Sequence, residues 1–327
     1  MRIVITDSNF VSDEPERAVL SAAGLTVERF NCRTEEEMIE AGKGADAVLV
    51  QFAPVTRRVI EAWTSCRLIV RYGIGYDNVY IPAADGAGIA VCNVPSYCLD
   101  EVADHTCALL LSGLRKVVAF DRSVRSGEWN VEKVAKPMPR FADSVVGLIG
   151  FGRIGARVAE RIRPFGFQIL IYDPYMSADK AEQLGVHKAA TLEELLSKAD
   201  AISLHSPLTE DTKHLINATT LSQMKSGALL VNTSRGGLID TEALATALNE
   251  GTIGGAAIDV FEQEPLQNDH PLRSCDNLIL TPHAAYYSDS ALITLQTQAA
   301  EEVVRLAQGL PLASQVNRPS GGQGGSR

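Results

Sequence analysis

The sequence predicts an α/β protein with two doubly wound domains, each built on a parallel sheet that helices cover on both faces. Short apolar runs alternate with helical stretches along almost the whole chain, which is the pattern of β-α units. The length of 327 residues exceeds that of one typical domain and suits two. A glycine-rich turn at 150–155, between an apolar run and a helical stretch, places one such unit in the second domain.

The first domain should contain five strands, at residues 3–6, 26–30, 47–51, 68–71 and 89–92. The helical stretches between these strands lie at 14–23, 35–41 and 56–63. Thr34 and Glu37 form a capping-box pattern, which predicts the start of the second of these helices. The next stretch, from 99 to about 125, is helical in pattern throughout, and we interpret it as one long hinge helix that leads into the second domain.

The second domain should begin after an exposed arm or loop at 127–143, which carries Pro137 and Pro139. Its six predicted strands lie at 145–149, 169–172, 201–204, 229–232, 256–260 and 278–281. A final helix at about 289–308 should return to the first domain. The expected division is therefore a discontinuous first domain at 1–98 and 289–317, a second domain at 99–288, and a disordered Gly/Ser-rich tail at 318–327.

The composition is that of an ordinary globular protein, with 46% hydrophobic and 21% charged residues. A net charge of −10 argues against binding to nucleic acid or to an anionic membrane surface. No apolar run reaches the roughly 18 residues that a membrane span needs, and the N-terminus reads as a strand, so we expect a cytoplasmic protein. The six cysteines show neither a C-x-x-C pair nor metal-ligand spacing, which predicts free buried thiols and no metal site.

The glycine-rich turn has the features of a dinucleotide site. Gly150 allows a sharp turn out of the strand, Gly152 allows close approach of a pyrophosphate, and Gly155 allows the helix to pack closely on the sheet. Asp173 ends the next apolar run, 18 residues after Gly155, near the roughly 20 expected for an acid that bonds the ribose hydroxyls. A carboxylate there repels a 2′-phosphate, so the pattern favours NAD over NADP. The alternative is a plain strand–turn–helix connection.

Three polar residues, Arg235, Glu264 and His283, each follow a predicted strand of the second domain. Because ligands of open α/β sheets bind outside the carboxyl ends of the strands, all three can face one site. Hydride transfer from a nicotinamide to a 2-oxo acid needs three functions from the protein, and these side chains can supply them. An arginine can hold the carboxylate, a histidine can supply the proton, and an acid can orient the histidine. Taken singly, they could instead be a surface ion-pair arginine, a solvated loop acid and an ordinary loop histidine.

The motifs resemble the D-2-hydroxyacid dehydrogenase family over roughly residues 3–310. They are RYGIGYDNV (71–79), VCNVPSYCLDEVADHT (91–106), GLIGFGRIG (147–155), LVNTSRGGLID (230–240), AAIDVFEQEP (256–265) and TPHAAYYS (281–288). Within the family, the chain is most similar to the branch that includes the eukaryotic C-terminal-binding protein corepressors. The resemblance implies a flavodoxin-like substrate domain, an inserted NAD-binding Rossmann domain and an active-site cleft between them. It also implies a homodimer formed mainly through the NAD domains, with the arm after the hinge helix crossing over.

The resemblance further implies two sets of binding residues, with Asp259 meeting the nicotinamide carboxamide. The cofactor-binding set comprises Thr106, Gly150, Phe151, Gly152, Arg153, Ile154, Gly155, Asp173, His205, Ser206, Pro207, Thr212, Thr233, Ser234, Arg235, Asp259, His283 and Ala285. The substrate-binding set comprises Arg71, Ile74, Gly75, Arg235, His283 and Tyr286.

Arg71 and Tyr286 bear on specificity. Arg71 matches an arginine that faces substrate in the corepressor branch, and Tyr286 stands where that branch carries a tryptophan. If Arg71 faces the site, it can bind a second anionic group on the substrate, such as a phosphonate, phosphate or carboxylate. Arg71 could instead pair with Asp77, and Tyr286 could pack under the C-terminal helix. The expected function is an NAD-dependent interconversion of a 2-oxo and a D-2-hydroxy acid. The alternative is an NADH-sensing, corepressor-like binding protein with residual dehydrogenase activity.

Overall fold

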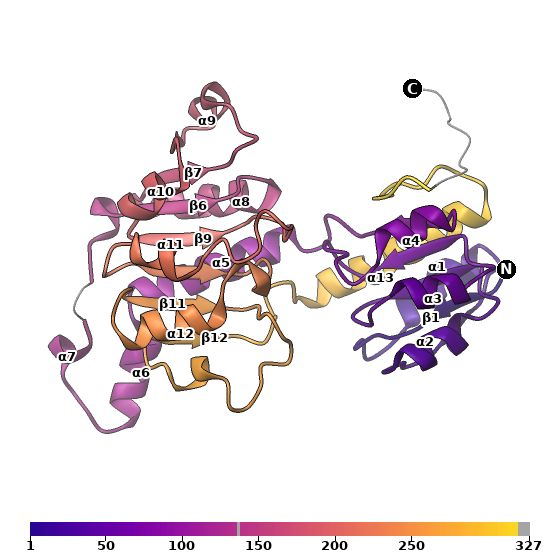
Figure 1. Ribbon diagram of the computed structural model, residues 1–327, viewed down its shortest axis with the longest axis horizontal. Helices are drawn as coiled ribbons and strands as arrows, with labels where there is room; N and C mark the ends of the chain where they lie inside the picture. Colours follow the sequence, from indigo (N-terminus) through magenta and orange to yellow (C-terminus); the bar gives the residue numbers. More distant parts are fainter. Residues whose placement is uncertain (136–137, 320–327) are drawn as a thin grey trace. The chain divides into compact units, whose positions relative to one another are not determined.

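The computed structural model describes residues 1–135 and 138–319 (Figure 1), so Pro137 and positions 320–327 of the predicted tail lie outside the described residues. Contacts divide the chain into two units. The small unit comprises Met1–Tyr97 and the chain from Ser288 onward, and the large unit comprises Cys98–Tyr287.

The small unit is built on a five-stranded sheet in the order β2-β1-β3-β4-β5, with every pair of neighbours parallel. This is the flavodoxin-like order, and it confirms the predicted fold class. The strands are β1 (Ile3–Ile5), β2 (Val27–Arg29), β3 (Ala47–Val50), β4 (Leu68–Arg71) and β5 (Ala90–Cys92).

Helices cover both faces of the small unit's sheet. They are α1 (Glu14–Ala22), α2 (Glu35–Gly42), α3 (Arg57–Ala62), α4 (Ile81–Gly86) and α13 (Asp289–Ala307). The capping box predicted at the start of α2 is present, with Thr34 and Glu37 each bonding the other's backbone N–H. The C-terminal helix α13 buries Leu295, Ala299 and Val303 in the same apolar core as β1 and β4. Sequence-distant segments therefore build this unit together.

The large unit is built on a seven-stranded parallel sheet in the order β12-β11-β10-β9-β6-β7-β8. Its strands are β6 (Val145–Ile149), β7 (Gln168–Tyr172), β8 (His187–Lys188), β9 (Ala201–Leu204), β10 (Leu229–Asn232), β11 (Gly255–Ile258) and β12 (Leu278–Leu280). The order changes direction between β6 and β9, which makes the carboxyl ends of these strands the switch point where such sheets bind ligands. The prediction missed β8, because its two residues are polar and carry no apolar run.

The helices of the large unit are α5 (Leu99–Leu114), α6 (Val117–Arg125), α7 (Val131–Ala135), α8 (Arg153–Ile162), α9 (Ala178–Gln183), α10 (Leu192–Lys198), α11 (Ala218–Ser222) and α12 (Thr241–Asn249). The described part of this unit also contains four short 3₁₀ turns, η1 (Phe141–Asp143), η2 (Arg163–Phe165), η3 (Gly236–Leu238) and η4 (Pro271–Ser274). Two apolar cores lie on the two faces of the sheet.

The prediction of one continuous helix from 99 to 125 is wrong. The helix ends at Leu114, and Lys116 takes a left-handed conformation (φ 53°) before α6 begins. A left-handed residue reverses the local direction of the backbone and stops the helical hydrogen-bond series. The arm predicted as irregular also contains the short helix α7, and both α6 and α7 extend from the edge of the large unit in Figure 1.

The cysteines and the helix lengths were also predicted from the sequence. All six cysteines are described, and each is buried and free, as predicted. Among the residues that the structure describes, no helix has the length and apolar character needed to cross a membrane.

Candidate active site

The glycine-rich turn joins β6 to α8 with the geometry that the three glycines predict. Gly150 has a φ of +89°, and a Cβ added there would lie 2.7 Å from the carbonyl oxygen of His205. At Gly155 a Cβ would lie 2.6 Å from the carbonyl oxygen of Gly150, so the helix packs too closely for any side chain. By contrast, apart from Gly152 and its two neighbours in the chain, no described residue has an atom within 4 Å of the Cβ position of Gly152, the N-cap of α8. This open space before a ten-residue helix is what a pyrophosphate needs.

Asp173 stands at the end of β7, facing this turn. One carboxylate oxygen accepts a hydrogen bond from the Phe151 amide at 2.8 Å, and the other accepts from the Tyr175 amide at 2.8 Å. These two bonds fix the carboxylate beside the glycine turn. The position suits an acid that recognises a ribose bound across the carboxyl ends of β6 and β7.

The loop after β9 forms the opposite wall of the turn. Both ring nitrogens of His205 are buried and lack a hydrogen-bond partner among the described residues. Burial lowers the pKa of His205 from 6.5 to about 4, so the imidazole is neutral at physiological pH. Ser206 donates from its hydroxyl to the Ile149 carbonyl at 3.3 Å, and Thr212 bonds the Pro207 carbonyl at 2.7 Å. The first bond holds the loop against the end of β6, and the second joins two residues within the loop.

The loop after β10 is fixed by its own side chains. The hydroxyls of Thr233 and Thr106 are 2.7 Å apart, and the Ser234 hydroxyl donates to the Leu204 carbonyl at 2.6 Å. Asn232, which the sequence did not single out, accepts from the Ser234 amide and donates to the Arg235 carbonyl at 2.8 Å. The backbone that carries Arg235 is therefore held from both sides.

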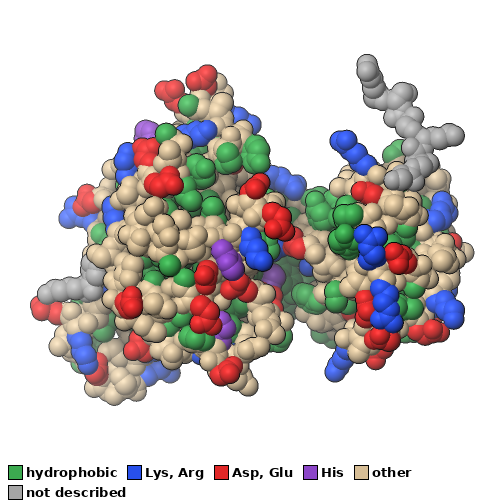
Figure 2. Space-filling model, in the orientation of Figure 1, with side chains coloured by type: hydrophobic (Ala, Val, Ile, Leu, Met, Phe, Trp, Pro, Cys, Tyr) green, Lys and Arg blue, Asp and Glu red, His purple; other side chains and the backbone are tan. Residues whose placement is uncertain are grey.

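The central feature of the site is a histidine–carboxylate pair. Nδ1 of His283, after β12, lies 2.7 Å from Oε2 of Glu264, which lies in the loop after β11. The other oxygen of Glu264 accepts from the Phe261 amide at 2.9 Å. Burial alone would raise the pKa of Glu264, but the bonds from His283 and Phe261 and the charge of Arg235 bring it below the ordinary 4.5. In Figure 2, histidine side chains lie beside acidic ones on the visible face of this unit.

Asp259 shapes the turn that presents His283. Its side chain is fully buried, and it accepts hydrogen bonds from the Thr281 hydroxyl at 2.5 Å and from the amides of Ala284 and Ala285 at 2.8 and 3.0 Å. The His283 amide donates to the Asp259 carbonyl at 2.7 Å. His283 itself is left-handed (φ 52°), a conformation that costs about 1–2 kcal/mol for a residue other than glycine. The bonds to Asp259 hold the histidine in that conformation.

The loops after β10 and β11 meet at Gly236. A Cβ added to Gly236 would lie 1.8 Å from the backbone carbon of Phe261 and 2.4 Å from the Glu262 nitrogen. Arg235 precedes this contact, and Glu264 follows it three residues beyond Phe261. The close approach therefore sets the spacing between Arg235 and Glu264.

The remaining predicted residues divide between the two units. Tyr286 lies with the histidine, since the ring centroids of His283 and Tyr286 are 6.0 Å apart in an edge-to-face arrangement. Arg71, Ile74 and Gly75 belong to the small unit. The loop that carries them is tight: a Cβ at Gly73 would lie 1.8 Å from Nη1 of Arg71, and Asn93 donates to the Ile74 carbonyl at 2.6 Å.

Sequence reasoning missed three further polar residues beside the predicted set. His105 lies 3.3 Å from the Thr281 hydroxyl and 3.7 Å from the Asp259 carboxylate. His214 and Glu262 form a second histidine–carboxylate pair with an Nε2–Oε1 distance of 2.5 Å. The only sequence signal for these residues was their place near predicted strand ends and motifs.

Comparisons with known proteins identify the family of the chain. The model of the D-isomer specific 2-hydroxyacid dehydrogenase NAD-binding domain matches residues 107–285. A glyoxylate reductase from Korarchaeum cryptofilum is 41% identical over 281 residues, which cover 84% of this chain and 84% of that protein. A D-3-phosphoglycerate dehydrogenase from Archaeoglobus fulgidus is 38% identical over 91% of this chain, but this chain covers only 56% of that protein.

A solved structure shows the same fold. The D-lactate dehydrogenase from Aquifex aeolicus, complexed with NAD and lactic acid, has a TM-score of 0.84 and 28% identity, covering 94% of this chain and 96% of that one. The similarity to the corepressor branch stays a prediction, because these relatives do not test it. The glycine turn, the strand order and these matches together show that the chain belongs to the D-isomer specific 2-hydroxyacid dehydrogenase family and is an NAD-dependent enzyme of that family.

Proposed function

We propose that the protein reduces a 2-oxo acid to a D-2-hydroxy acid with NADH, and catalyses the reverse reaction with NAD, using His283 as the general acid and base. The 2.7 Å bond between Nδ1 of His283 and Glu264 carries this proposal. A carboxylate on Nδ1 orients the ring and stabilises its charged form, so that Nε2 can give a proton to the substrate oxygen. Bound NADH supplies the hydride.

Arg235 binds the substrate carboxylate in this proposal. A guanidinium can hold a carboxylate through two parallel hydrogen bonds, which fixes both the position and the plane of a 2-oxo acid. The packing of Gly236 against Phe261 supports this role, because it couples the position of Arg235 to that of Glu264. In this proposal Asp173 bonds the ribose hydroxyls and disfavours a 2′-phosphate, so that the site favours NAD over NADP.

The substrate class depends on Arg71. The two relatives are named for substrates that differ in a second anionic group: glyoxylate carries none, and a phosphoglycerate carries a phosphate. We propose that Arg71, at the end of β4, contacts substrate and favours a 2-oxo acid with a second anionic group, and that Tyr286 packs beside the reacting carbon. The position of Tyr286 against the ring of His283 supports the second assignment.

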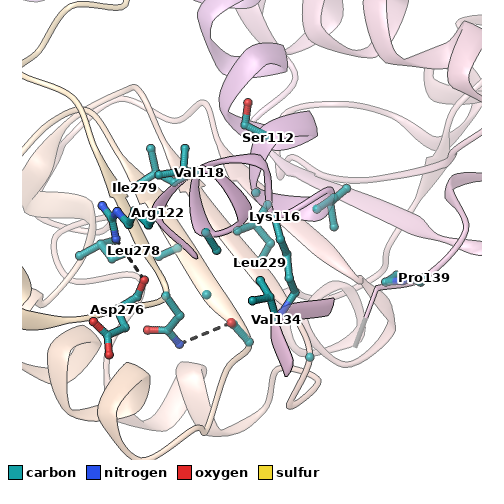
Figure 3. A pocket seen from close by; sticks show the side chains of 18 of the residues that line it. Ser112, Lys116, Val118, Arg122, Val134, Pro139, Leu229, Asp276, Leu278 and Ile279 are labelled. Atoms are coloured by element: carbon teal, nitrogen blue, oxygen red, sulfur yellow. Dashed lines mark hydrogen bonds between the residues drawn. The ribbon is translucent and has the colours of Figure 1, made fainter. Parts of the chain in front are cut away.

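We also propose that two copies associate through the large unit. A cavity of about 370 Å³ lies beside α6 and α7 (Figure 3), with Leu114, Val118, Leu278 and Ile279 among its apolar lining. Figure 3 shows the Lys116 side chain running across it toward Val134. The adjoining arm exposes large apolar side chains, foremost Trp129 at 90% exposure. A second copy of this chain offers both the arm and the cavity, so one exposed apolar surface can cover the other.

The association is tested by the mass of the protein in solution. Light scattering of the wild type should give roughly twice 35.2 kDa. Trp129→Glu should lower this mass, whereas Val11→Glu, which changes a fully exposed apolar residue of the small unit, should leave it unchanged. A monomeric wild type would refute the proposal.

The activity is tested by NADH oxidation across a panel of 2-oxo acids, with and without a second anionic group, using wild type, His283→Ala and Arg71→Gln. Fast turnover of one class that His283→Ala abolishes, with NADH affinity retained, is the expected result. A selective loss of the dianionic substrates in Arg71→Gln would support its role. Tight NADH binding without turnover of any acid would contradict the enzymatic proposal and favour an NADH-sensing binding protein.

A further inference from the structure

We propose that Glu262 is a positioning residue for the reaction: it anchors the loop that carries Glu264 and thereby sets the hydrogen bond between Glu264 and His283. The inference rests on the proposed function of His283. Glu262 lies only two residues before Glu264, but its side chain takes part in a separate histidine–carboxylate pair.

Glu262 uses both of its oxygens. Oε1 lies 2.5 Å from Nε2 of His214, and Oε2 accepts from the hydroxyl and the amide of Thr241 at 2.6 and 3.1 Å. Thr241 is the first residue of α12, so the carboxylate also lies at the positive end of a helix. The three bonds of this side chain join three separate segments of the large unit.

Further hydrogen bonds hold the two anchors, His214 and Thr241, in place. The amide of His214 donates to the Gly237 carbonyl at 2.8 Å, and the Asn217 side chain donates to the His214 carbonyl at 2.9 Å. His214 has a φ of +50°, so its backbone is held in a left-handed conformation that few residues adopt. Thr241 is buried, and the N-cap Asp240 accepts from the amide of Ala243. Glu262 therefore ties a loop to two fixed points.

The connection to the reaction runs through the backbone on both sides of Phe261. The amide of Phe261 donates to Oε1 of Glu264 at 2.9 Å, while Oε2 of Glu264 bonds His283. Glu262 directly follows Phe261, and the same stretch of backbone packs on Gly236, next to Arg235. If Glu262 loses its anchors, this stretch of backbone can move, and the movement reaches both Glu264 and Arg235.

The carboxylate of Glu262 is ionised, as its role in anchoring the loop requires. Burial alone would raise the pKa of Glu262, but the bonds from Thr241 and His214 and the charge of His214 hold it below the ordinary 4.5. The carboxylate is therefore ionised at physiological pH and accepts all of its bonds.

The test compares Glu262→Ala with Glu262→Gln in NADH-dependent reduction of the best 2-oxo acid. We expect Glu262→Ala to lower kcat/KM by roughly 10- to 100-fold, since a displacement on the order of 1 Å at a catalytic group can cost about 100-fold. The alkaline limb of the pH profile should also move to lower pH, because a misplaced Glu264 stabilises the protonated histidine less well. Glu262→Gln can still accept from Thr241 and donate to His214, and it should recover most of the activity.

Controls separate positioning from simple instability. Glu242→Ala removes an exposed acid next to Thr241 and should leave kcat/KM and the pH profile unchanged. If Glu262→Ala does not fold, His214→Asn replaces it, since asparagine tolerates left-handed backbone and is too short to reach Glu262. The His214→Asn variant should also shift the alkaline limb of the pH profile to lower pH.

The outcomes are distinct. A lower melting temperature for the Glu262 or His214 variant, with kcat/KM and the pH profile unchanged below that temperature, would mean a purely structural residue and would overturn the inference. The same holds if Glu262→Gln is as impaired as Glu262→Ala. If His283→Ala retains full turnover, the proposed function fails and the inference falls with it. If only His283→Ala loses turnover, the inference alone fails.

Discussion

Replacing Gly236 by alanine tests the contact that spaces Arg235 from Glu264. The added Cβ would lie 1.8 Å from the backbone carbon of Phe261, whereas an ordinary contact begins at 3.4 Å. The two loops must therefore separate by about 1.6 Å, and no side-chain rotation can relieve the clash, because the obstructing atoms belong to the backbone. A displacement of this size at a catalytic group can lower kcat/KM by about 100-fold. Overpacking of this kind costs about 1–3 kcal/mol.

The assay measures NADH-dependent kcat/KM and thermal unfolding of Gly236→Ala beside Gly237→Ala. Gly237 is the matched control, because its added Cβ meets only the flexible Leu208 side chain, at 3.0 Å and beyond. We expect a roughly 100-fold loss of kcat/KM and a melting temperature lower by roughly 2–12 °C for Gly236→Ala, and small changes for Gly237→Ala. Equal activity and equal stability of the two variants would refute the reasoning.

Three further predictions concern cofactor choice, the turn at His283 and acid stability. Asp173→Ala should narrow the gap between kcat/KM for NADH and NADPH; an unchanged ratio would show that Asp173 does not read the ribose. Asp259→Asn should lower the free energy of unfolding by about 1–3 kcal/mol in denaturant titrations, because a buried acceptor becomes a donor facing N–H groups, and it should reduce turnover. The lowered pKa of Glu264 contributes stability above pH 4.5 that is lost as pH falls below 4.5, so Glu264→Gln should flatten the acid branch of stability against pH. Parallel acid branches in the two proteins would contradict this.

The fold was largely predictable because its strands are buried on both faces. A strand such as β6 appears in the sequence as a continuous apolar run, and the structure places it at 145–149 as predicted. The helix start at Thr34 was predictable for a related reason, since a capping box is complete within four residues. The two-residue β8 and the break at Lys116 were not predictable, because neither a polar strand nor a left-handed lysine leaves a local pattern.

In the site, too, features with a local sequence pattern were predictable and features that depend on tertiary packing were not. The glycine turn and the residues after each strand have short motifs, and these motifs identified Arg235, Glu264 and His283 as candidates. The pair of Glu262 and His214 joins residues 48 positions apart, and its existence depends on how two loops pack. The orientation of Asp259 into the turn at 281–285 is likewise a property of the folded loops.

The left-handed backbone at His283 restricts which residues can replace it without disturbing the loop. Asparagine and glycine accept a positive φ, whereas alanine and β-branched residues bear its steric cost. In experiments, His283→Asn therefore removes the imidazole with less disturbance of the loop than His283→Ala, because asparagine also tolerates a positive φ. Over longer times, a descendant that lost the reaction but kept the fold would tend to carry asparagine or glycine at this position. Under the proposed role of His283, the identity of residue 283 in a relative therefore indicates whether that relative keeps the general acid and base.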